Sequence, residues 1–525
     1  MMSNNSLEWQ DEFAEMEART EFARNMGGEQ ALQKLRASGK LNARERIKLL
    51  VDDESFREFG TFSGKGHYDE NGNLLSVTPS TQVTGLGKID GRKIVVCSDD
   101  FTIRGGSSEA SIAEKWIYAD RYAYEYKLPL IRLVDSAGGS VKLLKQSGHT
   151  KIPGYSLLPG PFMLGVVPVV GIALGACAGL GAVRAATAHF SIMVRGKSQV
   201  FAGGPPVVKQ ALGYDIDKES LGGYEIHRQS GVINNGVESE EEAFQLARRF
   251  LSYLPSNVWE QPSRAPSNDP VDRKEPWLND AIPRDRRKLF QPRKILNAIF
   301  DKDSVFEIAP HFGGSVITVL ARINGYTVGV MINNPSNMGG ALTRAAATKM
   351  ERFVDMCDTF HLPMVNLVDQ PGTMTGVEAE KIATVSGTLR ASAAIEQSSI
   401  PWCAIVIRRC FGLAGSLLSP RFGPTGTSIP HRFAWPSARW GSIPIEGGVA
   451  AAYRKDIEQA DDPTALRDRL EKEYHQYESP FRTAERFGIV NVIKPDSTRE
   501  LLADWVEDAY KVAATKLGPK GRTMR

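Results

Sequence analysis

The feature that most constrains this chain is an internal repeat, in which two long stretches match each other at a constant spacing. GKIDGRKIVVCSDD (87–100) matches ARINGYTVGVMINN (321–334), and GGSSEASIAEKWIYADRYAYEYKLPLIRLVD (105–135) matches GGALTRAAATKMERFVDMCDTFHLPMVNLVD (339–369). Both pairs are offset by 234 positions without a gap, and VPVVGIALGACAGLG then matches IPWCAIVIRRCFGLA at 233. A shared offset over so long a stretch indicates two copies of one structural unit.

Each copy predicts strands that alternate with helices. An apolar strand follows a turn, Asp90-Gly91 or Asn324-Gly325, and leads to a Gly-Gly pair and a helical pattern. The strand LPLIRLVD or LPMVNLVD comes next and ends at a glycine loop, and a further helix leads to the strand before a Gly-Leu turn. Strands that are apolar throughout are typical of a sheet covered on both faces. The expected fold class is therefore α/β, as a tandem of two similar domains.

The composition along the chain predicts its domain boundaries. Residues 1–50 are strongly charged with a helical pattern, and we expect them to form an N-terminal helical arm. The first copy then spans residues 51–255 and the second spans residues 279–525. Between them, residues 256–278 are rich in Pro, Ser and Asp and are predicted to be a linker.

Composition also excludes several functional classes. The 525 residues carry 64 basic and 61 acidic side chains, so the net charge of +3 does not point to nucleic acid or an anionic membrane as a partner. Five scattered cysteines without a CxxC pair indicate neither a disulfide framework nor a metal site. A reducing compartment fits this cysteine pattern. The polar N-terminus does not resemble a targeting signal, and we expect a cytoplasmic protein.

One stretch is long enough to suggest a membrane helix, because residues 152–183 contain no charged side chain. Four prolines and many glycines interrupt it, however, and the apolar segment VPVVGIALG begins at Val167. A buried parallel strand between loops is the better interpretation, and a membrane span is the alternative.

The two Gly-Leu turns are the candidate site. In GACAGLGAVRAA (175–186) and RRCFGLAGSLLS (408–419), an apolar strand enters glycines and then a helical stretch. Such a turn presents backbone N–H groups without intrahelical partners, which can stabilise a developing oxyanion. Small residues leave room for a carbonyl group to approach. The alternative is that the glycines only allow a helix to pack closely on the sheet.

Several motifs in order resemble the carboxyltransferase β subunit of biotin-dependent acyl-CoA carboxylases. The glycine turns, the upstream LVDxxG and the downstream FAWP (433–436) resemble that family, whose members are tandems of two crotonase-like domains. The resemblance extends almost from end to end, through GGEQALQKLRASGKLNARERIKLLVDDESFREFG (27–60), SLGGYEIHRQSGV (220–232), VDQPGTMTG (368–376) and SPFRTAERFGIVNVIKPDSTRELL (479–502).

The resemblance implies an enzyme that moves CO2 from carboxybiotin to the carbon beside an acyl-CoA thioester. The ureido nitrogen of biotin takes the acidic proton, so no side-chain base is required. The resemblance also implies two oxyanion holes, made by the backbone N–H groups of Leu180 and Gly181 and by those of Leu413 and Ala414. The first copy is expected to hold the acyl-CoA and the second to hold biotin. The two holes would meet across a dimer interface within a homohexamer.

The same resemblance implies further binding residues. The acyl-CoA substrate is expected to contact Ala137, Gly138, Gly139, Lys142, Gly179 and Ser416. Biotin is expected to contact Gly372, Thr373, Gly412, Phe433 and Trp435, although packing in the core is an alternative for the FAWP residues. ATKM (347–350) resembles a biotin-attachment sequence, but Lys349 lies in a helical pattern and matches Lys115 of the first copy. Biotin is therefore expected on a separate carrier subunit that works with a biotin carboxylase, and no metal is expected.

The chain departs from the family pattern at several positions. A leucine replaces the second glycine of Gly-Gly-Ala in both turns, and DSAGGS (135–140) lacks the arginine of DSGGAR, whose role Lys142 is expected to take. Ser416 stands where the family often has a residue that selects the substrate. These changes suggest an acyl group other than acetyl or propionyl. Two alternatives remain: a decarboxylase or transcarboxylase subunit of the same fold, and an inactive scaffold subunit.

Overall fold

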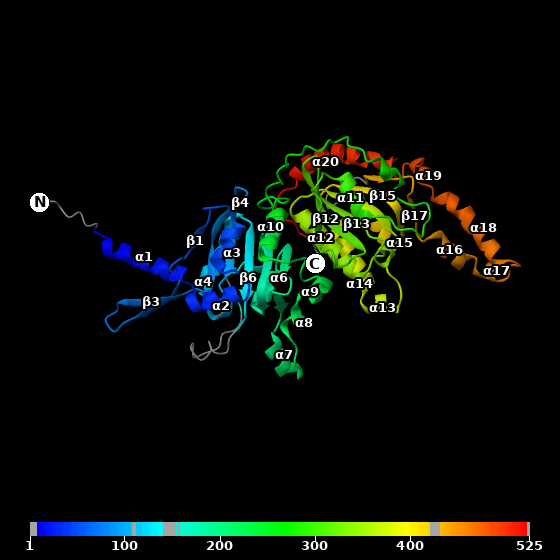
Figure 1. Ribbon diagram of the computed structural model, residues 1–525. Coiled ribbons are helices and arrows are strands. Elements are labelled where there is room, and N and C mark those ends of the chain that lie inside the picture. The colour runs from blue at the N-terminus through cyan, green and yellow to red at the C-terminus, as the bar shows by residue number, and fades with distance from the viewer. Residues whose placement is uncertain (1–7, 108–111, 140–153, 155–157, 421–430, 522–525) are drawn as a thin grey trace. The chain divides into compact units, whose positions relative to one another are not determined.

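The computed structural model describes residues 8–107, 112–139, 154, 158–420 and 431–521, and the chain divides into two compact units between Ser252 and Tyr253 (Figure 1). Unit 1 precedes this boundary and unit 2 follows it. Each unit is built around one mixed β-sheet with helices packed on it. The α/β class predicted from the repeat is therefore confirmed.

The described part of unit 1 contains a sheet in the order β1-β4-β5-β6-β7-β8-β10, with β9 paired to β7. The pairs among β1, β4 and β5 are antiparallel, and the pairs from β5 onward are parallel. The strands are β1 (Arg57–Phe59), β4 (Gln82–Ile89), β5 (Arg92–Asp99), β6 (Leu130–Ser136), β7 (Val169–Ala178), β8 (Phe190–Val194), β9 (Gln199–Phe201) and β10 (Asn235–Val237), and a separate hairpin contains β2 (Gly64–Tyr68) and β3 (Leu74–Pro79). The helices are α1 (Gln10–Arg24), α2 (Glu29–Ala37), α3 (Ala43–Leu50), α4 (Ala113–Tyr126), α6 (Leu180–Ala186), α7 (Pro205–Leu212), α8 (Lys218–Gly222), α9 (Tyr224–Ser230) and α10 (Glu240–Leu251).

The described part of unit 2 repeats this order as β11-β12-β13-β14-β15-β16-β18, with β17 paired to β15. Its strands are β11 (Phe306–Ile308), β12 (Val316–Ile323), β13 (Tyr326–Asn333), β14 (Met364–Gln370), β15 (Trp402–Phe411), β16 (Arg432–Ala434), β17 (Arg439–Gly441) and β18 (Asn491–Val492). Its helices are α11 (Pro292–Ile299), α12 (Arg344–Thr359), α13 (Val377–Lys381), α14 (Thr384–Glu396), α15 (Gly412–Gly415), α16 (Ile445–Ala452), α17 (Arg454–Glu458), α18 (Pro463–His475), α19 (Pro480–Ala484) and α20 (Thr498–Ala514).

The repeat extends to details of the backbone. The hairpins β4–β5 and β12–β13 both turn through two residues with positive φ, Asp90-Gly91 (51° and 78°) and Asn324-Gly325 (52° and 79°). Such turns match the right-handed twist of the strands they join. A register shift follows Val134 in the pair β6–β7, and the same shift follows Val368 in β14–β15. Each shift lies next to the loop that carries candidate site residues.

The core of unit 2 lies between its sheet and the helices α11 and α20. Leu296 of α11 and Val506 of α20 are completely buried, together with strand residues such as Val330, Leu367 and Ile405. Full burial of one such side chain contributes roughly 1.5–3 kcal/mol. In unit 1, α6 approaches the sheet closely, since a Cβ on Gly171 of β7 would lie 2.1 Å from the carbonyl O of Ala185. Close packing therefore explains this glycine.

Residues 256–278, predicted as a linker from their composition, pack along unit 2. The carbonyl O of Val258 accepts a 2.6 Å hydrogen bond from Nε2 of the buried His361. Asp269 binds the buried Arg499 (3.6 Å) as well as Arg273 (2.7 Å), and the N–H of Ala265 donates to the carbonyl O of Gly325 (2.9 Å). The segment is irregular backbone that contacts with the rest of unit 2 hold at several points. Proline suits backbone of this kind, which explains the proline-rich composition.

We expect His361 to make the stability of unit 2 depend on pH. Burial lowers the pKa of His361 to about 4, so this imidazole stays neutral in the folded chain at pH values where the unfolded chain is protonated. Stability should fall by about 1–3 kcal/mol as the pH drops from about 6.5 to about 4. His361→Asn, which tolerates the positive φ of this position, should flatten that dependence in urea unfolding curves. If stability changes equally steeply with pH in His361→Asn and in the unaltered chain, His361 is not the source of the pH dependence.

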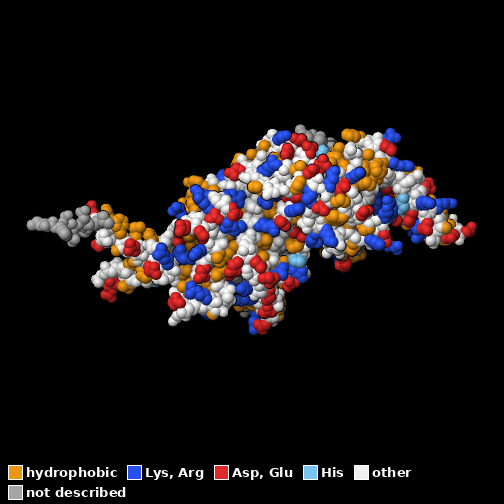
Figure 2. All heavy atoms as spheres, turned by 45° about the horizontal axis from the view of Figure 1, so that its top comes forward, with side chains coloured by type: hydrophobic (Ala, Val, Ile, Leu, Met, Phe, Trp, Pro, Cys, Tyr) orange, Lys and Arg blue, Asp and Glu red, His pale blue; other side chains and the backbone are white. Residues whose placement is uncertain are grey.

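No helix in the described residues is long and apolar enough to cross a membrane. The segment from Val169 to Ala178, within the uncharged stretch, forms the buried strand β7, as predicted. On the face shown in Figure 2, Lys and Arg side chains are interspersed with Asp and Glu, as the small net charge leads one to expect.

Candidate active site

The first candidate turn joins β7 to α6. Gly179 has a φ of 55°, a conformation that favours glycine, and its N–H donates to the carbonyl O of Phe201 (3.1 Å). Beyond it, the N–H groups of Leu180 and Gly181 have no acceptor among the described residues. A Cβ on Gly181 would lie 3.0 Å from the Cβ of Ser136. The turn therefore presents two adjacent N–H donors and is packed against the end of β6.

The loop that follows β6 lies against this first turn. Gly138 has a φ of 83°, and a Cβ there would lie 3.0 Å from the carbonyl O of Ala178. The hydroxyl of Ser107 donates to the carbonyl O of Gly138, and the N–H of Ala137 donates to the carbonyl O of Gly105 (2.9 Å). Of the predicted substrate contacts, Ala137 and Gly138 thus lie beside the turn. Gly139 is exposed next to them, and Lys142 lies outside the described residues.

The second candidate turn joins β15 to α15 and has the same form. Gly412 has a φ of 62°, and the N–H groups of Leu413 and Ala414 have no acceptor in the described part of the chain. A Cβ on Gly415 would lie 2.9 Å from the backbone of Cys410, so the turn is tightly packed. The hydroxyl of Ser416 donates to the carbonyl O of Leu413 (2.7 Å). Ser416 therefore helps to hold the turn.

The loop after β14 carries two of the predicted biotin contacts. The carbonyl O of Gly372 accepts a hydrogen bond from the N–H of Leu342 (3.0 Å). Thr373 pairs with the same leucine in an isolated parallel β-bridge. The side chain of Gln370 accepts from the N–H of Gly372 (3.1 Å) and lines a small cavity together with Ala414. Through Gln370, the structure thus brings the loop at Gly372 to the second turn. The sequence analysis did not identify Gln370 as a site residue.

Phe433 and Trp435 lie elsewhere. Trp435 is completely buried, its indole N–H donates to the hydroxyl of Thr498 (3.0 Å), and both aromatic side chains belong to the core formed with α20. The structure does not bring these side chains to the second turn. Packing in the core, the alternative interpretation of the FAWP motif, accounts for both.

A buried carboxylate lies at the end of each of the strands β6 and β14. Asp369 binds Arg409 through Nε (2.6 Å) and Nη2 (2.8 Å), and Arg409 also donates to the carbonyl O of Gly339 (2.8 Å). Asp135 binds Arg46 and Lys40, both at 3.2 Å. Both carboxylates are therefore engaged in ion pairs, which leaves neither as a free general base.

The cysteine that precedes each turn is also unsuited to nucleophilic chemistry. Burial raises the pKa of the Cys410 thiol to about 12 and also raises the pKa of Cys177. A protonated buried thiol is a poor nucleophile. Within the described residues there is also no group of His, Cys, Asp and Glu side chains that could hold a metal ion. The chemistry available at the two turns is hydrogen bonding from main-chain N–H groups.

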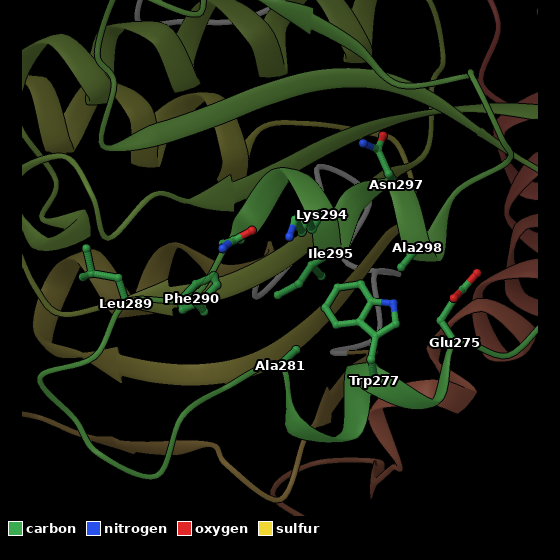
Figure 3. Close-up of a pocket in the computed structure, with 10 residues that line it drawn as sticks. Glu275, Trp277, Ala281, Leu289, Phe290, Lys294, Ile295, Asn297 and Ala298 are labelled. Carbon is green, nitrogen blue, oxygen red and sulfur yellow. The ribbon is translucent and has the colours of Figure 1, made fainter.

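A groove of about 620 Å³ in unit 2 contains none of the predicted site residues (Figure 3). It lies between the segment that carries Trp277 and the helix α11, and Ile295 and the charged Lys294 face it.

Comparison with known proteins identifies the family. A family model described as the carboxyl transferase domain matches residues 34–522. The chain belongs to the carboxyl transferase family. It is a carboxyltransferase enzyme, and the resemblance to acyl-CoA carboxylase subunits predicted from its motifs is confirmed.

Relatives and a solved structure agree with this membership. The chain is 32% identical over 500 residues to the propionyl-CoA carboxylase, carboxyltransferase subunit, of Haloferax mediterranei, which covers 94% of this chain and 95% of the relative. It is 34% identical over 487 residues to the methylmalonyl-CoA carboxyltransferase 12S subunit of Propionibacterium freudenreichii subsp. shermanii, covering 92% and 91%. A crystal structure of a transcarboxylase 12S hexamer with methylmalonyl-coenzyme A bound matches with a TM-score of 0.85 at 30% identity, covering 99% of this chain and 98% of that one. The tandem crotonase-like architecture fits this family.

Proposed function

We propose that this enzyme transfers a carboxyl group between biotin on a separate carrier subunit and an acyl-CoA, with one glycine turn serving each reactant. The N–H groups of Leu180 and Gly181 bind the thioester oxygen, and those of Leu413 and Ala414 bind the ureido oxygen of biotin. The observation that carries the proposal is the pair of matched turns, each with two adjacent N–H donors that lack an acceptor among the described residues.

The residues of the second turn fit a biotin ureido group. Its oxygen is a planar acceptor that needs donors and a close approach to the backbone, and Gly412 has no side chain to obstruct that approach. The buried Ala414 adds only a methyl group. When bound, carboxybiotin supplies CO2 and, at its ureido nitrogen, the base for the acidic proton. Leu413 and Ala414 would hold the ureido oxygen through their N–H groups.

The first turn has the complementary task. Removal of the proton beside a thioester places negative charge on the thioester oxygen, and the N–H groups of Leu180 and Gly181 stabilise that charge as it develops. Donors that are already oriented need no reorganisation during the reaction, which is why such groups contribute strongly to catalysis. The half-exposed Leu180 and the loop at Ala137 and Gly138 would form the wall next to the acyl group. This apolar wall favours an acyl chain larger than acetyl.

We also infer that the chain works as a homohexamer with a biotin carboxylase and carrier subunit. The hexameric 12S structure and its coverage of both chains almost end to end support this assembly. Transcarboxylation is a second candidate reaction, favoured by the 34% identity to the 12S subunit.

The test is an assay of the purified chain with free biotin and a panel of malonyl-type CoA esters. We expect biotin-dependent decarboxylation, which is the reverse of carboxyl transfer and excludes an inactive scaffold. Copurification of a biotin carboxylase subunit, followed by incorporation of labelled bicarbonate into acyl-CoAs of different chain lengths, then separates carboxylation from transcarboxylation. Absence of turnover with every ester, in both the isolated chain and the copurified complex, would contradict the proposal.

A further inference from the structure

A second cavity in unit 2, of about 300 Å³, is lined by four arginines: Arg284, Arg286, Arg408 and Arg439. We call it the arginine pocket. Asp280 is the one carboxylate among the described residues that line it. Arginines crowded so closely repel one another unless an anion neutralises them. The pocket therefore raises the question of which anion it binds.

Arg408 is the most informative member. Arg408 is only 5% exposed. Its Nη2 donates a hydrogen bond to the carbonyl O of Arg286, and its guanidinium lies 6.0 Å from the ring centre of Phe290. Its Nη1 has no hydrogen-bond partner within the described residues. A buried donor on a charged group is costly to leave unpaired, by about 1–3 kcal/mol or more. A bound acceptor would remove that cost.

Of the other three arginines, one forms an ion pair with a carboxylate, and two form none among the described residues. Arg286 binds Glu446 (2.6 Å) and contacts His475 (3.1 Å). In the described part of the chain, the guanidinium groups of Arg284 and Arg439 form no hydrogen bond or ion pair. The nearby Glu478 binds His475 (2.7 Å) and forms no ion pair with Arg284 or Arg439 in the described residues.

The pKa shifts of the arginines agree with an excess of positive charge in the pocket. Burial lowers the pKa of Arg439, and the neighbouring Arg286 and Arg408 lower it further, although Glu478 and Glu446 oppose them. Burial also lowers the pKa of Arg408, with Arg409 and Arg286 adding to the effect against the opposing charge of Asp369. These cations are thus held together in surroundings that disfavour their charge.

The arginine pocket uses groups that the candidate active site does not. Arg408 and Arg409 are neighbours in β15, but Arg409 binds Asp369 and Gly339, whereas Arg408 contacts Arg286 and Phe290. The strand then continues to Gly412. A ligand in the arginine pocket would therefore bind next to the strand that carries the second turn without taking the place of either reactant.

We propose that the arginine pocket binds a small phosphorylated anion. Guanidinium groups match the oxygen geometry of phosphate, and three arginines without a carboxylate partner favour an anion with more than one negative charge. A volume of about 300 Å³ is at the lower end of small-molecule sites, so it accommodates a diphosphate or a phosphate ester as well as a single phosphate. Asn279 and Ser437 add polar groups to the wall.

The test is isothermal titration calorimetry on the full chain with orthophosphate, pyrophosphate and AMP, at constant ionic strength in chloride, with citrate as a carboxylate comparison. We expect saturable binding of one anion per chain, tightest for pyrophosphate or AMP, and these two ligands distinguish an inorganic from an ester source. Arg439→Gln and Arg284→Gln should each weaken binding by about tenfold or more. Both variants should retain carboxyl transfer, so their result is separate from that of the proposed function.

Arg287→Gln is the matched control, because Arg287 is in the same segment, has a side chain that is 94% exposed and does not line the pocket. It should bind the anion within about twofold of the unaltered chain. Circular dichroism and Tm establish that each variant is folded. Absence of saturable binding of all three phosphates, equal weakening by Arg287→Gln, or tighter binding of citrate than of pyrophosphate and AMP would overturn the proposal.

Discussion

Replacing Leu180 by proline is expected to lower kcat for carboxyl transfer by about 10²–10³. Proline has no backbone N–H, so the substitution removes one of the two donors assigned to the thioester oxygen. Leu180 is the first residue of α6, a position at which proline is tolerated because its fixed φ suits the start of a helix. Gly179 before it lacks the Cβ that would clash with the proline ring.

Leu180→Ala is the matched control, because it removes the same side chain and keeps the N–H. Its turnover should stay within a few-fold of the unaltered enzyme, measured by the biotin-dependent decarboxylation assay. A second control, Val183→Ala, changes the exposed face of the same helix. If the proline variant is folded by circular dichroism and turns over as fast as Leu180→Ala, the N–H of Leu180 does not take part in catalysis.

Replacing Arg46 by methionine is expected to lower the free energy of unfolding of unit 1 by about 3–5 kcal/mol. Arg46 in α3 has a side chain that is only 1% exposed, and it binds Glu240 through Nε (2.8 Å) and Nη2 (3.0 Å) and Asp135 through Nη2 (3.2 Å). Methionine fills similar space, but it leaves Asp135 with Lys40 as its cation and Glu240 with no ion pair among the described residues. Their desolvation would then be poorly compensated.

The control for Arg46 is Arg121→Met, which removes an exposed i,i+4 pair with Glu125. Such a pair contributes about 0–1 kcal/mol, so this variant should unfold almost like the unaltered chain. Urea unfolding, followed by circular dichroism, measures both. If Arg46→Met shifts the curve no more than Arg121→Met, the Arg46 network does not hold α3 on the sheet.

Much of the fold follows from the repeat. The matching offsets predicted the duplicated strands and helices, and the structure adds that the hairpin turns and register shifts are duplicated as well. The turns could be predicted because Asp-Gly and Asn-Gly have local preferences for positive φ. The glycine turns could also be located from the sequence, since an apolar strand that enters glycines has a local signature.

Contacts between distant residues could not be predicted in this way. Arg408 contacts Arg286, which is 122 residues away, and the sequence offers no periodic signal for such a pair. The pair of Arg409 and Asp369 is similar, although the matched position of Asp135 in the first copy was an available clue. For Trp435, motif resemblance suggested a ligand contact, but the direction of its side chain depends on the helix α20, which follows much later in the chain.

The most direct test of the two-turn account is a crystal structure of the enzyme with an acyl-CoA and biotin bound. The account predicts that the thioester oxygen lies about 2.7–3.1 Å from the backbone N atoms of Leu180 and Gly181, and that the ureido oxygen lies equally close to those of Leu413 and Ala414. Reactant oxygens bound to side chains elsewhere, with these four N–H groups donating to other parts of the protein, would contradict it.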